Sequence, residues 1–129
     1  MIKTSEEKAS LLIIDDDKSI RYILQKSLED EGYQVEIDQN GQEALSVLAA
    51  GYRPVMILLD IHMPIMDGLQ FLAAKARESS SAEIGVIVIS AADGVENLFL
   101  NQRCGFLRKP INFEELMPVL KMQFYKKVV

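Results

Sequence analysis

The chain has 129 residues, which is the length of one ordinary domain with a hydrophobic core of its own. Its 49% hydrophobic and 26% charged side chains are typical of a globular protein in water, and no apolar run approaches the roughly 20 residues of a membrane span. Lys and Arg number 14 against 19 Asp and Glu, a formal net charge of −5, and no basic stripe is present, so direct binding to nucleic acid is not expected.

The chain opens with residues 1–10, which are polar and lack the apolar stretch of a signal peptide. We expect a polar leading segment there, followed by one folded domain over residues 11–127. The single cysteine, Cys104, excludes an internal disulfide and is interpreted as a small buried hydrophobic residue. Both features agree with a cytoplasmic location.

The first half of the folded domain alternates between short apolar runs and segments of helical periodicity. The run "LLII" at 11–14 predicts a buried strand, and residues 18–31 predict a helix that ends at Gly32. The run "QVEI" at 34–37 alternates between polar and apolar residues, which is typical of a strand at a sheet edge. Residues 41–50 predict a second helix. The apolar stripes of these helices are Ile20, Ile23, Leu24 and Leu28, and then Ala44, Leu45 and Leu48.

The second half repeats this alternation three times. Strands are predicted at 55–59 and 86–89, where the runs "VMILL" and "VIVI" are continuous, and at 106–107. A helix is predicted after each of them. These helices are 67–78, with a stripe of Leu69, Leu72, Ala73 and Ala76; 94–103, with Val95, Leu98 and Phe99; and a last one from Asn112 through Leu116 and Leu120. Pro118 falls inside the last helix, so a kink or a restarted helix is expected there.

A strand-helix order repeated five times predicts an α/β fold with an open, doubly wound, five-stranded parallel sheet, (βα)5. In such sheets ligands bind outside the carboxyl ends of the strands. Polar side chains stand at these ends here. They are Asp15, Asp16 and Asp17 after the first strand, Asp60 after the third, Ser90 after the fourth and Lys109 after the fifth.

These side chains have the chemistry of a metal and phosphoryl site. Adjacent carboxylates repel one another, most strongly beside apolar walls, so a cation is expected among them. Carboxylate oxygens suit a hard divalent cation, and Mg²⁺ is the expected one. A lysine and a serine suit the oxygens of a phosphoryl group, and a carboxylate can act as the nucleophile and carry an aspartyl phosphate.

Four segments of the sequence resemble the receiver domain of two-component response regulators. They are "LLIIDDDKSIR" at 11–21, "LLDIHMPIMDG" at 58–68, "VIVISA" at 86–91 and "FLRKP" at 106–110. They follow the family's order and span nearly the whole chain, and the second fits the specific D-x-x-M-P-x-M-D-G pattern around the family's phosphoacceptor. The resemblance implies a flavodoxin-like receiver domain over residues 11–127.

The resemblance also implies a metal-dependent phosphoacceptor site. Asp60 matches the phosphorylated aspartate. Asp15 and Asp16 match the acidic pair, with Asp16 as the direct Mg²⁺ ligand and Asp15 acting through water. The backbone carbonyl of His62 matches the group that completes the metal shell.

Three further positions match the part of the family's site that senses the phosphoryl group. Ser90 matches the switch hydroxyl, and Lys109 matches the lysine that pairs with the phosphoryl group. Phe106 lies where the family places its switch aromatic residue. The resemblance further implies a cis bond between Lys109 and Pro110.

Other residues near the motifs are given structural roles. Asp17 is expected to cap the first helix, and the imidazole of His62 is expected to be exposed. The remaining expectations are loop packing for Met63 and Met66 and solvated side chains for Arg21 and Arg108.

Some positions depart from the family's pattern. The segment 91–105 is shorter than usual by roughly one helical turn of 3.6 residues. Phe106 lacks the hydroxyl of the tyrosine often found there, and Ile111 replaces a common aromatic residue. Together with Pro118, these changes fall on the face that many receivers use to signal or to dimerise. The resemblance therefore implies the phosphorylation site but leaves the output mode open.

The sequence thus predicts a phosphoacceptor domain rather than an ordinary enzyme. Asp60 would take a phosphoryl group from a sensor histidine kinase or a histidine phosphotransfer protein, which would shift a conformational equilibrium and control a downstream protein. Slow hydrolysis of its own aspartyl phosphate is also expected. Because no output domain follows, a stand-alone regulator is expected.

Two alternative functions stay open at this point. One is a Mg²⁺-dependent phosphatase with Asp60 as nucleophile on external substrates, although such enzymes usually carry a second acid where His62 stands here. The other is an interaction-only receiver that is not phosphorylated.

Overall fold

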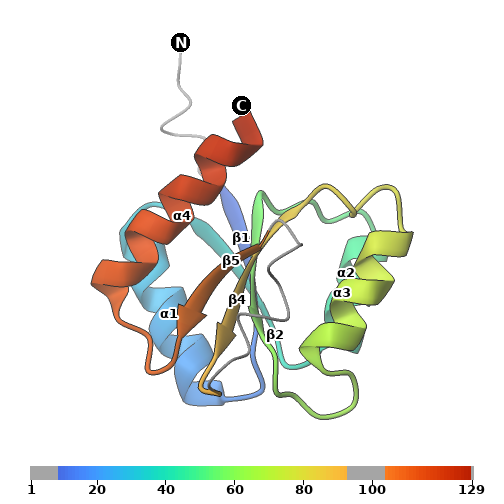
Figure 1. The fold of residues 1–129 in the computed structure, drawn as a ribbon, viewed down its shortest axis with the longest axis horizontal. Coiled ribbons are helices and arrows are strands. Elements are labelled where there is room, and N and C mark those ends of the chain that lie inside the picture. The colour runs from blue at the N-terminus through green and yellow to red at the C-terminus, as the bar shows by residue number, and fades with distance from the viewer. Residues whose placement is uncertain (1–8, 93–103, 129) are drawn as a thin grey trace.

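The computed structural model describes residues 9–92 and 104–128 as one α/β domain (Figure 1). The strands of its sheet are β1 (Ser10–Ile14), β2 (Gln34–Asp38), β3 (Met56–Asp60), β4 (Gly85–Ser90) and β5 (Cys104–Arg108). Its helices are α1 (Lys18–Asp30), α2 (Gly41–Ala49), α3 (Gly68–Arg77) and α4 (Phe113–Val128). The predicted helix at 94–103 and most of the shortened segment 91–105 lie outside the described residues. Within the described ranges, no helix is both long and apolar enough to cross a membrane.

The five strands are parallel and lie in the order β2-β1-β3-β4-β5. This order confirms the predicted doubly wound sheet and places "QVEI" at an edge. Parallel strands put all their carboxyl ends on one rim. β1 and β3 are direct neighbours, with Ile14 opposite Leu59, so the residues that follow these two strands meet at the centre of that rim.

Two hydrophobic clusters cover the two faces of the sheet. Figure 1 shows α1 and α4 on one face and α2 and α3 on the other. Leu11 and Ile13 of β1 point into the cluster under α1 and α4, and Leu12 and Ile14 point into the cluster under α2 and α3. Full burial of such a side chain contributes about 1.5–3 kcal/mol. Strands buried on both faces explain why the central runs of the sequence are continuously apolar.

Polar caps fix the start of the helices that follow the functional rim. The Asp17 carboxylate accepts hydrogen bonds from the backbone N–H groups of Ser19 and Ile20, which confirms it as the cap of α1. Asp67 and Gln70 form a reciprocal capping box at the start of α3. Each cap satisfies donors that the first turn leaves free. The loops after β1 and β3 are therefore held at both ends.

Three expectations about the helices are wrong in part. Ile23 is 61% exposed and Leu69 is 43% exposed, so neither belongs to the core. The buried face of α3 is instead Gly68, Phe71, Leu72 and Lys75. No restart occurs in the last helix, because α4 runs unbroken through Pro118. Pro118 is exposed, so the carbonyl that its ring leaves unpaired can be reached by water.

Candidate functional site

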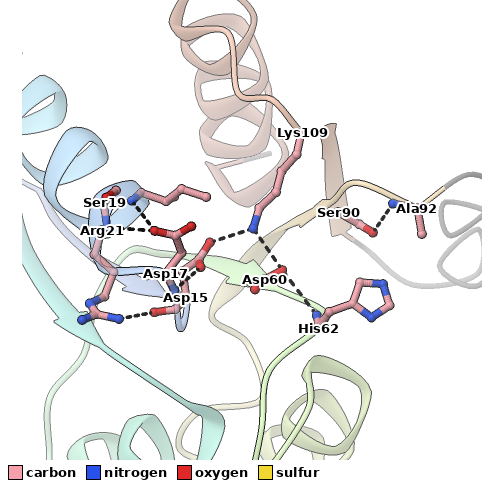
Figure 2. A network of polar contacts seen from close by, with 10 residues as sticks. Asp15, Asp17, Ser19, Arg21, Asp60, His62, Ser90, Ala92 and Lys109 are labelled. Carbon is pink, nitrogen blue, oxygen red and sulfur yellow. Dashed lines mark hydrogen bonds and ion pairs between the residues drawn. The ribbon is translucent and has the colours of Figure 1, made fainter.

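Three carboxylates, those of Asp15, Asp16 and Asp60, meet where β1 and β3 end. Figure 2 shows two of them, Asp15 and Asp60. Asp15 follows β1 and is 1% exposed, whereas Asp60 ends β3 and is 3% exposed. Asp16 is exposed beside them. One oxygen from each of the three lies within 4.8 Å of the others. The structure therefore brings together the acids that the sequence pattern singled out.

The position of Asp60 is fixed because the start of α3 lies close to β3, the strand that carries Asp60. The N–H of Gly68 donates to the carbonyl oxygen of Ile61 at 2.9 Å. A Cβ at Gly68 would stand 2.8 Å from Ile61 Cα and 3.0 Å from the carbonyl oxygen of Asp60. Only glycine leaves room for this contact. The start of α3 is thus packed directly against the backbone that carries Asp60.

Lys109 reaches across the rim from the end of β5 and lies between the two buried acids (Figure 2). Its Nζ is 3.2 Å from Asp15 Oδ2 and 3.4 Å from Asp60 Oδ1. Its backbone N–H donates to the carbonyl oxygen of Ser90 at 2.9 Å, which ties the lysine to β4. The side chain is only 19% exposed, so water screens these ion pairs weakly.

The cluster changes the protonation of its members. Burial first, and then the Asp15 carboxylate, raise the pKa of Asp60 to about 6, although Lys109 and the backbone N–H of His62 act in the opposite direction. Burial lowers the pKa of Lys109, but the carboxylates of Asp15 and Asp60 outweigh it, so the net shift is upward. The lysine stays charged at neutral pH, whereas Asp60 holds its negative charge at a cost that further positive charge would reduce.

The donor set fits a hard divalent cation. Every candidate ligand of the cluster is a carboxylate oxygen, which is the ligand type that Mg²⁺ prefers. Asp15 Oδ2 is buried, and the Lys109 ammonium, 3.2 Å away, is its ion-pair partner. A buried oxygen of this kind gains from a cation that it can contact.

The remaining predicted site residues lie around this cluster. His62 is exposed, as expected, and its backbone N–H lies 3.3 Å from Asp60 Oδ1. Ser90 is fully buried at the end of β4, and its hydroxyl accepts the N–H of Ala92 at 3.1 Å (Figure 2). Phe106 is half-buried opposite Val88 of β4. The Lys109–Pro110 bond is cis.

Sequence reasoning missed two residues near the site. Arg21 was expected to be solvated, but its Nη1 donates a 2.8 Å hydrogen bond to the carbonyl oxygen of Asp15. The sequence did contain a sign of this contact, since an arginine so close to the start of a helix is unfavourable next to the positive end of the helix dipole.

The second residue is Asp38, at the end of β2. Its backbone carbonyl oxygen accepts a hydrogen bond from the N–H of Asp15 at 3.2 Å. Burial, with Glu43 and Glu36 nearby, raises the pKa of Asp38 to about 6.

Comparison with known proteins gives this rim a family context. Residues 11–121 match the profile of the family described as the response regulator receiver domain. The chain belongs to this family. It is therefore a receiver domain of two-component signalling, a class whose members generally bind Mg²⁺ at acidic residues and work with histidine kinases.

Response regulators from several bacteria are similar to this chain over part of their length. It is 36% identical over 110 residues to the response regulator MprA of Mycolicibacterium vanbaalenii, a match that covers 83% of this chain and 46% of MprA. It thus spans about half the length of the curated relatives it matches.

Solved structures agree with this assignment. The receiver domain is 31% identical to the chemotaxis response regulator CheY4 of Vibrio cholerae, with a TM-score of 0.81 over 90% of this chain and 98% of CheY4. It is 27% identical to the response regulator TrrA of Thermotoga maritima, solved in complex with Mg²⁺ and BeF, with a TM-score of 0.78 over 89% of this chain and 98% of TrrA.

Proposed function

We propose that this receiver domain accepts a phosphoryl group on Asp60 from a phosphohistidine of a sensor histidine kinase or a histidine phosphotransfer protein. The observation that carries the proposal is the cluster on the rim, where three carboxylates lie within 4.8 Å and Lys109 Nζ is 3.4 Å from Asp60 Oδ1. This arrangement offers a nucleophile, oxygen ligands for a cation and a fixed positive charge in one place.

In the proposed transfer, a carboxylate oxygen of Asp60 attacks the phosphorus atom. A P–O bond forms, the P–N bond breaks, and the imidazole nitrogen leaves with the electron pair of that bond and takes up a proton from water. Lys109 pairs with the phosphoryl oxygens. Asp15, Asp16, Asp60 and the carbonyl of His62 would hold Mg²⁺, which would neutralise charge on the transferred group. The TrrA complex with Mg²⁺ and BeF supports this assignment by analogy.

The wider proposal concerns the role of the domain. The receiver domain extends over residues 11–127 after the polar segment 1–10, and it acts in the cytoplasm. It works as a phosphoacceptor rather than as an enzyme on external substrates, and it hydrolyses its own aspartyl phosphate slowly. The phosphorylated form controls a downstream protein, not nucleic acid directly, which agrees with the acidic net charge of −5.

Phosphorylation is expected at Asp60 alone when the protein is incubated with acetyl phosphate and Mg²⁺. Intact-mass analysis should show one added phosphoryl group in the parent and in Asp30→Asn, which removes an exposed carboxylate at the end of α1. Asp60→Asn should show none, because it lacks the nucleophile. A phosphoryl group found on another residue of the parent would overturn the site assignment.

Ser90 and Phe106 are proposed to couple the phosphoryl group to a change of shape. Ser90 is fully buried with its hydroxyl turned to Ala92, and Phe106 lies half-buried on the adjacent strand. A phosphoryl oxygen that draws the serine inward would open space for the aromatic ring.

Beryllofluoride, a mimic of the phosphoryl group, tests this coupling. It should shift the NMR signals of the Phe106 ring in the parent, and the shift should be largely lost in Ser90→Ala, which cannot donate to the mimic. Ser81→Ala is the control, because Ser81 is equally buried but bonds to the carbonyl oxygen of Lys75. Equal shifts in the parent and in Ser90→Ala would exclude the hydroxyl as the link.

A further inference from the structure

Arg21 makes a contact that the proposed phosphoryl transfer does not use. It is the fourth residue of α1 and is half-buried. Its guanidinium reaches back towards the start of the helix, and Nη1 donates to the carbonyl oxygen of Asp15 at 2.8 Å (Figure 2). Side chains of an α-helix tilt towards its N-terminus, which is what makes this reach possible.

A cation in this place carries an electrostatic cost. The N-terminal end of a helix is the positive end of its dipole, so acids are favoured there and arginine is not. Yet the first turn of α1 contains no acid, and its first four residues include Lys18 and Arg21. A local rule broken in this way usually has a compensating gain nearby. Here the compensation is the acidic cluster, which lies beside the same helix end.

The atom that Arg21 contacts determines what it can position. The carbonyl of Asp15 and the N–H of Asp16 belong to one rigid peptide plane. Arg21 holds one end of that plane, and the Cα of Asp16 lies at the other. In the described part of the chain, no hydrogen bond or ion pair restrains the exposed Asp16 carboxylate itself. The position from which this side chain extends is therefore set by the backbone.

Arg21 differs from Lys109 in what it leaves free. Lys109 lies against carboxylate oxygens of Asp15 and Asp60, so it competes with any cation for those atoms. Arg21 bonds a backbone oxygen and takes none of the carboxylate oxygens in this contact. It can hold the loop in place without occupying the ligand positions.

We propose that Arg21 is a positioning residue for the cation site: it holds the Asp15–Asp16 peptide so that the Asp16 carboxylate is preset for Mg²⁺. This inference rests on the proposed function, in which Asp16 is a direct ligand. Groups that orient metal ligands typically change metal affinity by 10–100-fold when they are replaced.

Position and charge predict opposite results, which makes the inference testable. If Arg21 acted only through its charge, Arg21→Lys would leave Mg²⁺ affinity unchanged, and the neutral Arg21→Gln would bind Mg²⁺ more tightly because one repelling cation is gone. If Arg21 positions the peptide, both variants bind Mg²⁺ more weakly, because a lysine or glutamine cannot reproduce the reach and planar donor geometry of the guanidinium.

The experiment is a calorimetric titration of the parent and the two variants with Mg²⁺ alone. We expect about tenfold weaker binding for Arg21→Lys. Arg21→Gln should also bind more weakly than the parent but lose less, because removal of the repelling charge offsets part of its loss. Arg53→Lys is the matched control. The Arg53 guanidinium also donates to backbone carbonyl oxygens, those of Leu48 at 2.7 Å and Tyr52 at 2.8 Å, but it follows α2 away from the acids. It should keep the parental affinity.

A second readout separates positioning from a general loss of stability. The amide signal of Asp16 in metal-free ¹⁵N spectra should shift in both Arg21 variants and stay in place in Arg53→Lys. A parent that does not bind Mg²⁺ would overturn the metal part of the proposed function. A parent that binds, with Arg21→Lys binding equally well or Arg21→Gln binding more tightly, would overturn only the positioning role.

Discussion

Lys109→Met should destabilise the metal-free protein by about 3 kcal/mol at about pH 8, because it leaves two buried carboxylates without their shared counter-charge. Asp15 and Asp60 are 1% and 3% exposed, and Lys109 Nζ lies within 3.4 Å of an oxygen of each. Loss of one partner from a buried ion pair costs about 3–5 kcal/mol. The lower value is expected here, because the Lys109 side chain is 19% exposed in the parent. Water can therefore reach the carboxylates when the ammonium is removed.

The same variant should recover stability when the charge is supplied in another way. The pKa of Asp60 is about 6 in the parent, and removal of Lys109 takes away a group that lowers it. At about pH 5 Asp60 is therefore mostly protonated in both proteins, and the loss should shrink. Saturating Mg²⁺ should also reduce it, because the cation would take over the neutralisation of the carboxylates. Urea unfolding followed by circular dichroism, at both pH values and with and without Mg²⁺, measures these differences.

A matched lysine separates charge from general effects of the substitution. Lys121 is exposed on α4, and Lys121→Met should change the free energy of unfolding by less than about 0.5 kcal/mol. A loss in Lys109→Met that is equal at both pH values and unaffected by Mg²⁺ would mean that the lysine contributes packing rather than charge.

The residues that the sequence could place are those whose position follows from topology. Asp60 is the last residue of β3, and Asp15 and Lys109 directly follow β1 and β5. A parallel sheet gathers the carboxyl ends of its strands on one rim. Their meeting therefore needs only the strand boundaries and the order of the strands. The distances of 3.2 and 3.4 Å between the lysine and the two acids refine that expectation without changing it.

Residues that act through long side chains could not be placed in this way. Arg21 could point to water or back along α1, and only the packed structure shows that it reaches the carbonyl of Asp15. Lys75 is a similar case. It is 5% exposed, and its ammonium donates to the carbonyl oxygen of Ala82 at 3.0 Å, so its apolar stem can enter the core. The hydrophobic pattern of the sequence treats Lys75 as polar, and it therefore predicts a buried face of α3 that contains Leu69 instead of Lys75.

Asp38 was missed for a related reason. A polar residue at the end of an edge strand is normally solvated, and the sequence gives no sign of the elements that cover it. In the structure one of its carboxylate oxygens is buried without a hydrogen bond, and Glu36 and Glu43 lie close enough to raise its pKa further. The burial of single atoms depends on the packing of several elements, which periodicity does not report.

Asp60→Asn should make the metal-free protein more stable by about 1–2 kcal/mol at about pH 8, although it abolishes the proposed phosphorylation. The rise of the Asp60 pKa from 3.8 to about 6 means that folding makes the ionised form of this carboxyl less favourable by about 3 kcal/mol. That value already includes the favourable ion pair with Lys109. The expected gain is smaller because the asparagine amide is itself a buried polar group that must find hydrogen-bond partners. Asp15 then keeps the lysine as its own counter-charge.

The pH dependence of this gain follows from the direction of the shift. A carboxyl whose pKa is raised by folding contributes stability that is fully present below 3.8 and is lost as the pH rises through about 6. The charged Asp60 therefore lowers the free energy of unfolding of the parent at about pH 8 but not at about pH 4. The stability advantage of Asp60→Asn should vanish as the pH is lowered from about 8 to about 4. Saturating Mg²⁺ should reverse the order of stability, since the parent keeps a ligand that the variant has lost.

Thermal unfolding of the parent, Asp60→Asn and the exposed control Asp30→Asn, at several pH values with and without Mg²⁺, measures all three effects. Asp30→Asn should follow the parent within about 0.5 kcal/mol throughout, because its carboxylate is solvated. An Asp60→Asn gain that is the same at about pH 4 and pH 8 would show that repulsion among the buried carboxylates is not its source. A gain that persists in saturating Mg²⁺ would remove Asp60 from the set of metal ligands, because the parent would then draw no advantage from its carboxylate.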